Sequence, residues 1–180
     1  MIPRVRCLKR STIYQGRVIK LVRDVLEIDG RRFARETILH PGAVVVIPVL
    51  DRRRIVLVRQ YRRAVDRFLL ELPAGTLEQG ERRDLCAKRE LLEETGWRAR
   101  SVRRLGRFYA APGFLSEEMT VFLATGLTQA TASPEPDEMV RPLVMSLREA
   151  LGKIRTGAIR DAKTIIGLWL AARYLQRRNQ

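Results

Sequence analysis

The sequence predicts a mixed α/β fold with a small β appendage at the N-terminus. The first half of the chain is dominated by short apolar runs separated by turn residues, a pattern typical of strands. A helical spacing of leucines follows near the middle, and two further helical patterns lie toward the C-terminus. The length of 180 residues and a hydrophobic fraction of 46% fit one globular domain and a small appendage.

Residues 1–40 are expected to form an N-terminal unit of short strands, followed by a main domain at 41–180. Residues 14–21 and 23–28 have the composition of two strands. Asp29-Gly30 comes directly after them, and this dipeptide is a strong signal for a two-residue hairpin turn. The chain should therefore reverse at this point.

The core strands follow a turn at Pro41-Gly42. Residues 43–50 are almost wholly apolar and predict a buried strand, and residues 55–61 form a second apolar run. Because only a short charged turn separates these two runs, we expect them to pair as a hairpin in the core sheet. A short strand at 68–72 should end at Pro73-Ala74-Gly75.

A helix is predicted at 82–95, because its leucines recur at helical spacing. Gly96 should end this helix, since glycine readily adopts the left-handed conformation found after a last helical turn. Strands are expected at 102–109 and 119–124. A loop rich in threonine, proline and acidic residues follows at 128–138.

The C-terminal part of the chain should contain one last strand and two helices. The strand is expected at 143–145. Ser146 and Glu149 have the spacing of a capping box, so a helix should begin there and end near Gly157. Asp161 is expected to cap the final helix.

The net charge of +15 first suggests a nucleic-acid or phosphate partner. However, 30 of the 35 basic residues are arginine, and such a bias can equally reflect genome composition. No basic run is interleaved with aromatic residues, which make up only 6% of the chain and would be needed as stacking platforms. The charge alone therefore does not choose a partner.

Composition excludes several other classes. No apolar run approaches the roughly 20 residues that span a bilayer, and the first ten residues lack the apolar core of a secretory signal. Two cysteines make no disulfide framework, so we expect a cytoplasmic protein. The single histidine, His40, excludes a multi-histidine metal site and argues against a histidine-based triad. Carboxylates and arginines should carry the chemistry of an enzyme.

The acidic residues are unevenly placed. Seven of the 20 lie between Glu71 and Glu94. Glu90, Glu93 and Glu94 stand at i, i+3 and i+4 in the last turns of the predicted helix, where like charges and the helix dipole both disfavour acids. A divalent cation would relieve both conflicts, and all-oxygen ligands favour Mg²⁺ or Mn²⁺. The alternative is a solvated acidic face neutralised by nearby basic residues.

The spacing around these acids distinguishes the two interpretations. Gly75, five residues, Glu81, seven residues, and then the run Arg89-Glu90-Leu91-Leu92-Glu93-Glu94-Thr95-Gly96-Trp97 match the Nudix box at every defined position. The chain thus resembles the Nudix hydrolases. The resemblance implies an α/β/α sandwich around a mixed sheet, and cleavage of nucleoside diphosphates linked to another moiety with the help of a divalent metal.

Roles in the site follow from the resemblance, position by position. Glu90, Glu93 and Glu94 would be metal ligands, together with the backbone carbonyl of Ala74. Arg89 and Glu81 would hold the loop and helix by ion pairing.

Motifs outside the box are similar to the ADP-ribose pyrophosphatase branch. They are Arg35-Glu36, His40 to Val44, Val58 to Arg62, Glu71 to Gly75, and Tyr109 to Glu117 with Pro112. This similarity implies that the substrate is contacted by Arg35, Glu36 and Arg62, and less strongly by Glu78 and Glu117. It also implies a homodimer in which the N-terminal strands exchange between subunits.

The catalytic base is expected from a mobile loop before the last strand, as in that branch. Glu138 fits this position best, although Glu135 and Asp137 lie in the same loop and Glu93 is a competing base.

The resemblance therefore implies a Mg²⁺-dependent hydrolase that cleaves the diphosphate of ADP-ribose into AMP and ribose 5-phosphate. Another nucleoside diphosphate sugar, such as ADP-glucose or GDP-mannose, is an alternative substrate. A nucleic-acid-binding protein that uses a Nudix domain without catalysis is the alternative from a different class.

Overall fold

The computed structural model describes residues 4–51, 54–133 and 139–177, and the chain divides into two compact units. The N-terminal unit comprises Met1–Gly42 and Tyr109–Glu118, and the main unit comprises Ala43–Phe108 and Met119–Gln180. The segment Tyr109–Glu118 thus groups with the N-terminal strands, whereas the sequence suggested that it lies in the main domain. Among the described residues, no helix is long and apolar enough to cross a membrane.

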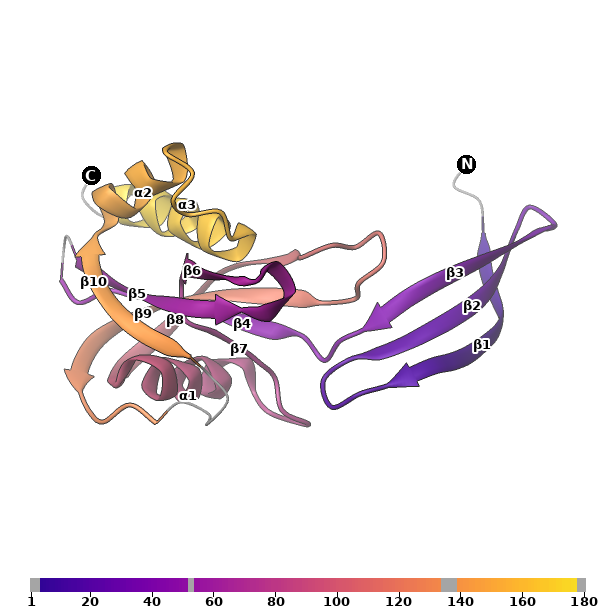
Figure 1. Ribbon diagram of the computed structural model, residues 1–180, viewed down its shortest axis with the longest axis horizontal. Coiled ribbons are helices and arrows are strands. Elements are labelled where there is room, and N and C mark those ends of the chain that lie inside the picture. Colours follow the sequence, from indigo (N-terminus) through magenta and orange to yellow (C-terminus); the bar gives the residue numbers. More distant parts are fainter. Residues whose placement is uncertain (1–3, 52–53, 134–138, 178–180) are drawn as a thin grey trace. The chain divides into compact units, whose positions relative to one another are not determined.

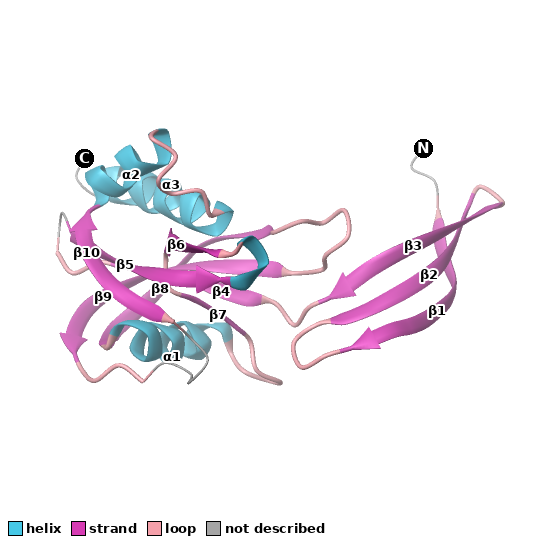
Figure 2. Ribbon diagram, in the orientation of Figure 1, coloured by secondary structure: helices cyan, strands magenta, loops and turns pink. Residues whose placement is uncertain are grey.

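The N-terminal unit contains a three-stranded antiparallel sheet of β1 (Val5–Gln15), β2 (Lys20–Ile28) and β3 (Arg31–Leu39), seen in Figures 1 and 2. The predicted hairpin at Asp29-Gly30 is confirmed, since both residues have positive φ angles, of 48° and 73°. The predicted strand at 14–21 is wrong. The chain reverses within it, where the Gly16 amide donates to the Ile19 carbonyl at 2.9 Å.

The segment Tyr109–Glu118 is fixed to the end of β3 by backbone hydrogen bonds. The Ile38 amide donates to the Phe114 carbonyl at 2.7 Å, and the Ser116 amide donates to the Ile38 carbonyl at 2.9 Å. The Ser116 hydroxyl also accepts from the His40 amide at 2.9 Å. These contacts explain why two segments distant in sequence form one unit.

Within its described residues, the main unit contains two sheets and three helices. One sheet has the strand order β7-β4-β9-β8 and the other has the order β10-β5-β6. The strands are β4 (Ala43–Pro48), β5 (Arg54–Arg62), β6 (Arg67–Glu71), β7 (Ala74–Thr76), β8 (Trp97–Tyr109), β9 (Glu118–Gln129) and β10 (Val140–Ser146). The helices are α1 (Arg83–Thr95), α2 (Leu147–Arg155) and α3 (Ala162–Arg177), with a 3₁₀ turn at Arg63–Val65.

The expected hairpin of residues 43–61 is wrong, although both of its strands are present. β4 pairs in parallel with β9 and antiparallel with β7, so both of its edges are occupied. β5 instead lies between β10 and β6. Just after β4, an isolated bridge between Val49 and Ile55 and a hydrogen bond from the Leu50 amide to the Arg54 carbonyl at 3.0 Å connect the chain to the start of β5. The apolar pattern identified buried strands but carried no information about their partners.

Alternate residues of β4 enter two separate cores, which produces the predicted α/β/α layering. Val44 and Val46 pack with Leu91 of α1, whereas Val45 and Ile47 belong to the core cluster completed by α2 and α3. All four valine and isoleucine side chains have no exposed surface. Figure 1 shows α1 on one side of the sheets and α2 with α3 on the other. This strand is therefore the centre of the main unit.

The predicted helix boundaries are confirmed by their caps. Gly96 follows α1 with φ 71° and ψ 20°, the left-handed conformation expected of a glycine cap. The Ser146 hydroxyl accepts from the Glu149 amide at 3.0 Å at the start of α2. The Asp161 carboxylate accepts from the Thr164 amide at 2.9 Å before α3. The Ser146 and Asp161 side chains thus bind backbone amides that have no partner within the first turn of the helix.

Candidate active site

The acidic helix α1 is presented to a short strand, β7, by packing on β4. Gly75 of β7 is the register partner of Val44 on β4. Helix α1 buries Cys86, Ala87 and Leu91 in the core that also contains Val44. The same strand therefore fixes both the loop that enters the helix and the helix itself.

Glu90 explains why glycine occupies position 75. A Cβ atom on Gly75 would lie only 1.8 Å from the Glu90 carboxylate carbon, so any side chain would displace the carboxylate. Glu90 is 8% exposed and lies over the strand backbone. The glycine of the box thus makes a cradle for an acidic side chain of the helix.

Glu94 is held against the same strand one helical turn later. One of its carboxylate oxygens accepts from the Ala74 amide at 3.2 Å, and the residue is 1% exposed. Glu93 points away from this buried position, since about a third of its side chain is accessible. The structure therefore brings Glu90, Glu94 and Ala74 together and leaves Glu93 at the rim.

Arg89 connects the acids of this region. Its guanidinium contacts both oxygens of Glu81 at 3.0 Å, Glu90 at 2.8 Å and Glu93 at 3.0 Å. It also donates to the Thr76 carbonyl at 3.3 Å. The hydrogen bonds with Glu81 raise the pKa of Arg89, and the same bonds lower the pKa of the Glu81 carboxyl. The ion pair predicted between Arg89 and Glu81 is confirmed.

The donor chemistry of this region suits a divalent cation. Its acceptors are carboxylate and carbonyl oxygens, the ligands that Mg²⁺ and Mn²⁺ prefer. As the side chains stand, no group of three histidine, cysteine or acidic residues within the described ranges is arranged to hold a metal. Arg89 contacts both Glu90 and Glu93, so a cation on these two carboxylates would have to displace it. Its paired contact with Glu81 could persist meanwhile.

Cys86 lies beside the acidic cluster but is poorly suited to react. Burial, reinforced by the nearby Glu81 and Glu90 charges, raises the pKa of its thiol to about 12. The sulfur lies 3.7 Å from the Thr76 carbonyl and 3.4 Å from an Arg89 nitrogen. A protonated, buried thiol is neither a nucleophile nor a metal ligand at neutral pH.

A second ionic cluster surrounds Glu71, the last residue of β6. Arg62 binds its carboxylate through two nitrogens, at 2.9 Å and 2.7 Å, and Lys163 of α3 contacts the same carboxylate. Lys163 also contacts Asp161 at 3.0 Å. Burial alone would raise the pKa of Glu71, but Arg62 and Lys163 outweigh it and the pKa is lowered. Two charges of each sign therefore balance within the cluster.

Arg62, which the sequence predicts as a substrate contact, is part of this ionic cluster. Its guanidinium fork is already used by Glu71, which is 1% exposed. The Arg62 side chain nevertheless remains 36% exposed, while Glu71 fixes the direction of its guanidinium.

The start of α3 also holds the chain between the two clusters. The Thr164 hydroxyl accepts from the Leu72 amide at 2.8 Å and donates to Asp161 at 2.6 Å. Leu72 lies two residues before Ala74, which contacts Glu94. Sequence reasoning saw Asp161 only as a helix cap and missed Lys163 and Thr164. The sequence signal for such a partner was Glu71 itself, because a glutamate between two leucines in an apolar strand indicates a buried carboxylate that needs a cation.

The remaining predicted site residues lie on exposed segments. Arg35 and Glu36 are exposed on β3, where the Arg35 guanidinium lies 5.7 Å from the Phe33 ring centre. Glu117, also in the N-terminal unit, approaches the His40 ring nitrogen at 3.6 Å. In the main unit, the Glu78 amide donates to Glu81 at 3.1 Å. The expected bases Glu135, Asp137 and Glu138 lie outside the described residues.

Removing the Lys163 ammonium should destabilise the protein in a pH-dependent manner. We expect Lys163→Met to lower the free energy of unfolding by about 2 kcal/mol at pH 7, because a buried carboxylate loses one of its two cations. Folding lowers the pKa of Glu71 from its ordinary value of 4.5. The ion pairs of Glu71 therefore stabilise the protein fully at pH values above 4.5. This stabilisation is lost as the pH falls through the lower pKa that Glu71 has in the folded protein. The difference in the free energy of unfolding between Lys163→Met and wild type should therefore become smaller at acidic pH.

Chemical denaturation at a series of pH values measures this effect, with Lys153→Met as the matched control. Lys153 pairs with Glu149 at 3.5 Å on an open helix surface, so its loss should cost at most about 0.5 kcal/mol. Equal effects of the two substitutions would contradict the role assigned to Lys163.

Comparison with known proteins agrees with the loop and helix described above. The family model of the NUDIX domain matches residues 39–167. An ADP-ribose pyrophosphatase of Bacillus subtilis is 38% identical over 174 residues, which cover 95% of this chain and 92% of that protein. A methanol dehydrogenase activator of Bacillus methanolicus is 39% identical over the same shares of both chains.

A solved structure extends the agreement to the whole fold. The crystal structure of an ADP compounds hydrolase superposes with a TM-score of 0.86, covering 99% of this chain and 96% of that one at 23% identity. Because the family model covers more than two thirds of the chain and its box is complete, the chain belongs to the Nudix family.

Proposed function

We propose that this protein is a divalent-metal-dependent pyrophosphatase of nucleoside diphosphate sugars, and that it cleaves ADP-ribose into AMP and ribose 5-phosphate. The observation that carries the proposal is the placement of Glu90 and Glu94 against β7, with Gly75 as the cradle. The ADP-ribose pyrophosphatase that covers almost the whole chain supports this substrate.

The proposed metal ligands are Glu90, Glu93, Glu94 and the Ala74 carbonyl, with Mg²⁺ preferred and Mn²⁺ as an alternative. When bound, the cation would neutralise charge on the diphosphate and make its phosphorus more electrophilic. Arg89 contacts the Glu90 and Glu93 carboxylates and pairs with both carboxylate oxygens of Glu81. The acids are therefore kept on one side of the helix before any substrate arrives.

The proposed substrate contacts are cationic and acidic side chains. Arg62 would present the exposed part of its guanidinium to the diphosphate while Glu71 fixes its orientation. Arg35 would stack on the adenine or bind phosphate, and Glu36 would accept from the adenine amino group. Glu78 and Glu117 are weaker candidates for the same substrate.

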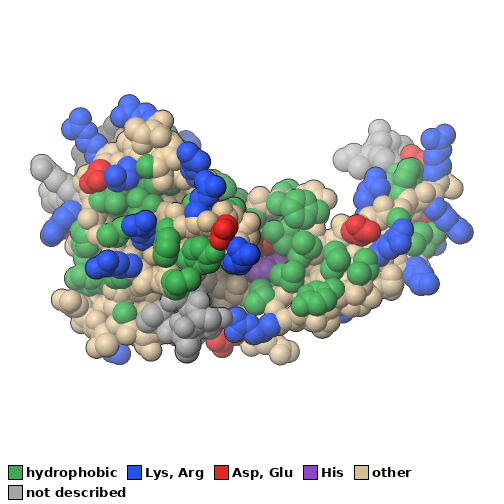
Figure 3. All heavy atoms as spheres, viewed as in Figure 1, with side chains coloured by type: hydrophobic (Ala, Val, Ile, Leu, Met, Phe, Trp, Pro, Cys, Tyr) green, Lys and Arg blue, Asp and Glu red, His purple; other side chains and the backbone are tan. Residues whose placement is uncertain are grey.

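The distribution of basic side chains on the face seen in Figure 3 does not favour a nucleic-acid partner. Figure 3 shows lysine and arginine side chains spread over the visible face and interrupted by apolar ones. Nucleic-acid sites gather such charges in a patch or stripe. We assign the excess charge to attraction of anionic substrates. We also propose a cytoplasmic location, because the cysteines Cys7 and Cys86 are both free.

Product analysis with a ligand variant tests the activity. Wild type should convert ADP-ribose into AMP and ribose 5-phosphate with Mg²⁺ and be inactive with a chelator. Glu94→Gln should lose at least about 100-fold in turnover, or about 2.7 kcal/mol, because a metal ligand loses its charge. Chromatography of the products after timed incubation measures both effects.

Glu149→Gln is the matched control, since Glu149 is an exposed helical acid on α2. Retained turnover in Glu94→Gln would contradict the metal assignment. Cleavage of ADP-glucose, GDP-mannose or NAD⁺ in preference to ADP-ribose would leave the site assignment intact and change the substrate.

The catalytic base is the second testable assignment. We propose Glu138, with Glu93 as its competitor. Glu138→Gln should lower kcat about 10²-fold to 10⁴-fold with KM changed by no more than about twofold, since a general base acts in the transition state. Steady-state kinetics would show this split. An unchanged kcat in Glu138→Gln together with a loss in Glu93→Gln would move the base to the helix.

We further propose a homodimer that uses the N-terminal strands. β1 is exposed along its whole length and carries large apolar side chains, including Ile13 at 53% and Tyr14 at 57% exposure. Light scattering should give about twice the chain mass of 20.7 kDa. Ile13→Glu should shift the mass toward the monomer, because a charge would be buried at the interface. Leu85→Glu, on the exposed surface of α1, is the control that should remain dimeric.

A further inference from the structure

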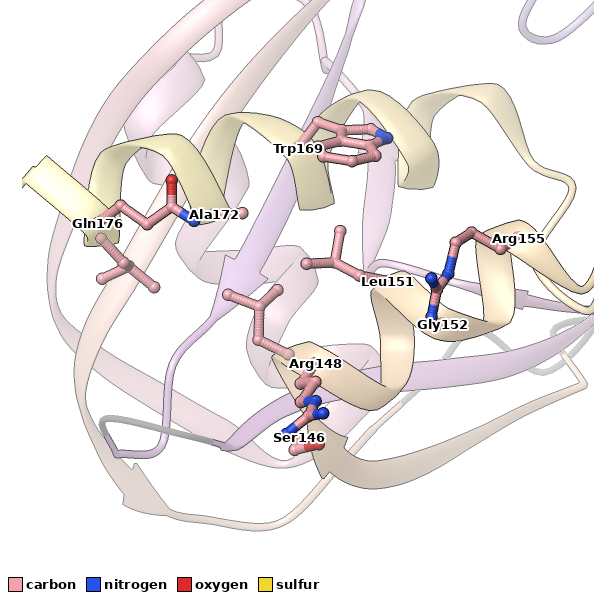
Figure 4. Close-up of a pocket in the computed structure, with 10 residues that line it drawn as sticks. Ser146, Arg148, Leu151, Gly152, Arg155, Trp169, Ala172 and Gln176 are labelled. Carbon is pink, nitrogen blue, oxygen red and sulfur yellow. The ribbon is translucent and has the colours of Figure 1, made fainter.

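A groove between α2 and α3 lies apart from the acidic cluster. Its volume is about 880 Å³, and ten residues from these two helices and the residue before α2 line it. Figure 4 shows the groove and its lining side chains. α2 and α3 complete one core of the main unit, whereas α1 with its acids belongs to the other core. The groove and the proposed catalytic acids are therefore on different faces of the same unit.

One wall of the groove is a large aromatic surface. Trp169 of α3 is 57% exposed, although a tryptophan of this size normally gains stability by burial. Figure 4 shows its indole across the groove from Leu151 and Gly152 of α2. An exposed indole beside aliphatic side chains offers a flat, apolar contact for a planar ring.

Gly152 widens the groove opposite that indole. It lies inside α2, where glycine costs about 1 kcal/mol relative to alanine. A Cβ atom at this position would meet no atom within 4 Å, and its φ angle is not positive. Neither packing nor backbone conformation therefore explains the glycine, whereas an occupant of the groove would.

Two arginines give the groove a positive charge. Arg148 and Arg155 are seven residues apart on α2, so they lie on the same side of the helix, and both line the groove. None of the ten lining residues is acidic. Within the described ranges, no ion pair joins either arginine to a carboxylate. The charge of the groove is therefore left for an anionic occupant.

We propose that this groove binds a nucleoside phosphate, with the base against Trp169 and the phosphate on Arg148 or Arg155. A flat base matches the exposed indole, and stacking of a base on an aromatic side chain contributes about 1–3 kcal/mol. A guanidinium binds phosphate through two parallel hydrogen bonds. The combination distinguishes a nucleotide from an alkyl anion, which would gain little from a planar wall. The proposal does not depend on the activity proposed above.

Tryptophan fluorescence tests the proposal with AMP as the probe. The chain has two tryptophans, so Trp97→Phe leaves Trp169 as the reporter. In a chelator-containing buffer, AMP should quench this fluorescence saturably with a Kd between about 0.01 and 1 mM. Gly152→Leu should abolish the quench by filling the groove. Arg148→Gln combined with Arg155→Gln should weaken binding at least about tenfold, by removing the phosphate contacts.

Controls separate the possible results. Arg173→Gln, an exposed arginine of α3 outside the lining, should bind AMP as wild type does. Calorimetry on the unmodified chain and on Gly152→Leu repeats the comparison without the Trp97 substitution. The proposal is overturned by three results: no saturable signal up to about 10 mM AMP, equal binding by Gly152→Leu, or equal binding of adenosine or inorganic phosphate alone.

Discussion

The charge of Arg89 makes the acidic loop and helix of the main unit possible. Three carboxylates lie toward the C-terminal end of a helix whose dipole is itself unfavourable to acids there, and a fourth, Glu81, lies just before the helix begins. One guanidinium reaches three of them and the backbone of β7 as well. A lysine could not do this, because its single ammonium lacks the planar set of donors. The geometry of the whole site rests on this one side chain.

The strand β4 is the second requirement, since it supports everything that Arg89 organises. Its alternating side chains fill cores on both faces, and its edges pair with β7 and β9. Helix α1 and the loop before it are thus attached to a strand that is buried on both faces and paired on both edges. From the other face, the Thr164 hydroxyl and Lys163 hold the residues that lead into β7. The site is supported from both layers of the sandwich.

The sequence predicted the parts of this arrangement that are local. The box spacing located the helix, its terminal Gly96 and the face that carries the acids, because these depend on a period of 3.6 residues and on backbone conformation. It could not predict that β4 and β5 belong to different sheets, since an apolar run does not name its partner. It also could not pair Lys163 with Glu71, because 92 residues separate them. Long-range contacts require the fold itself.

The two cysteines differ in a way that is useful at the bench. Cys86 is buried and its thiol stays protonated at neutral pH, while Cys7 is exposed on β1. A thiol-directed dye or spin label added to the folded chain would therefore attach at one position without any engineered substitution. That position lies on β1, so a label there would report on the surroundings of the N-terminal strands.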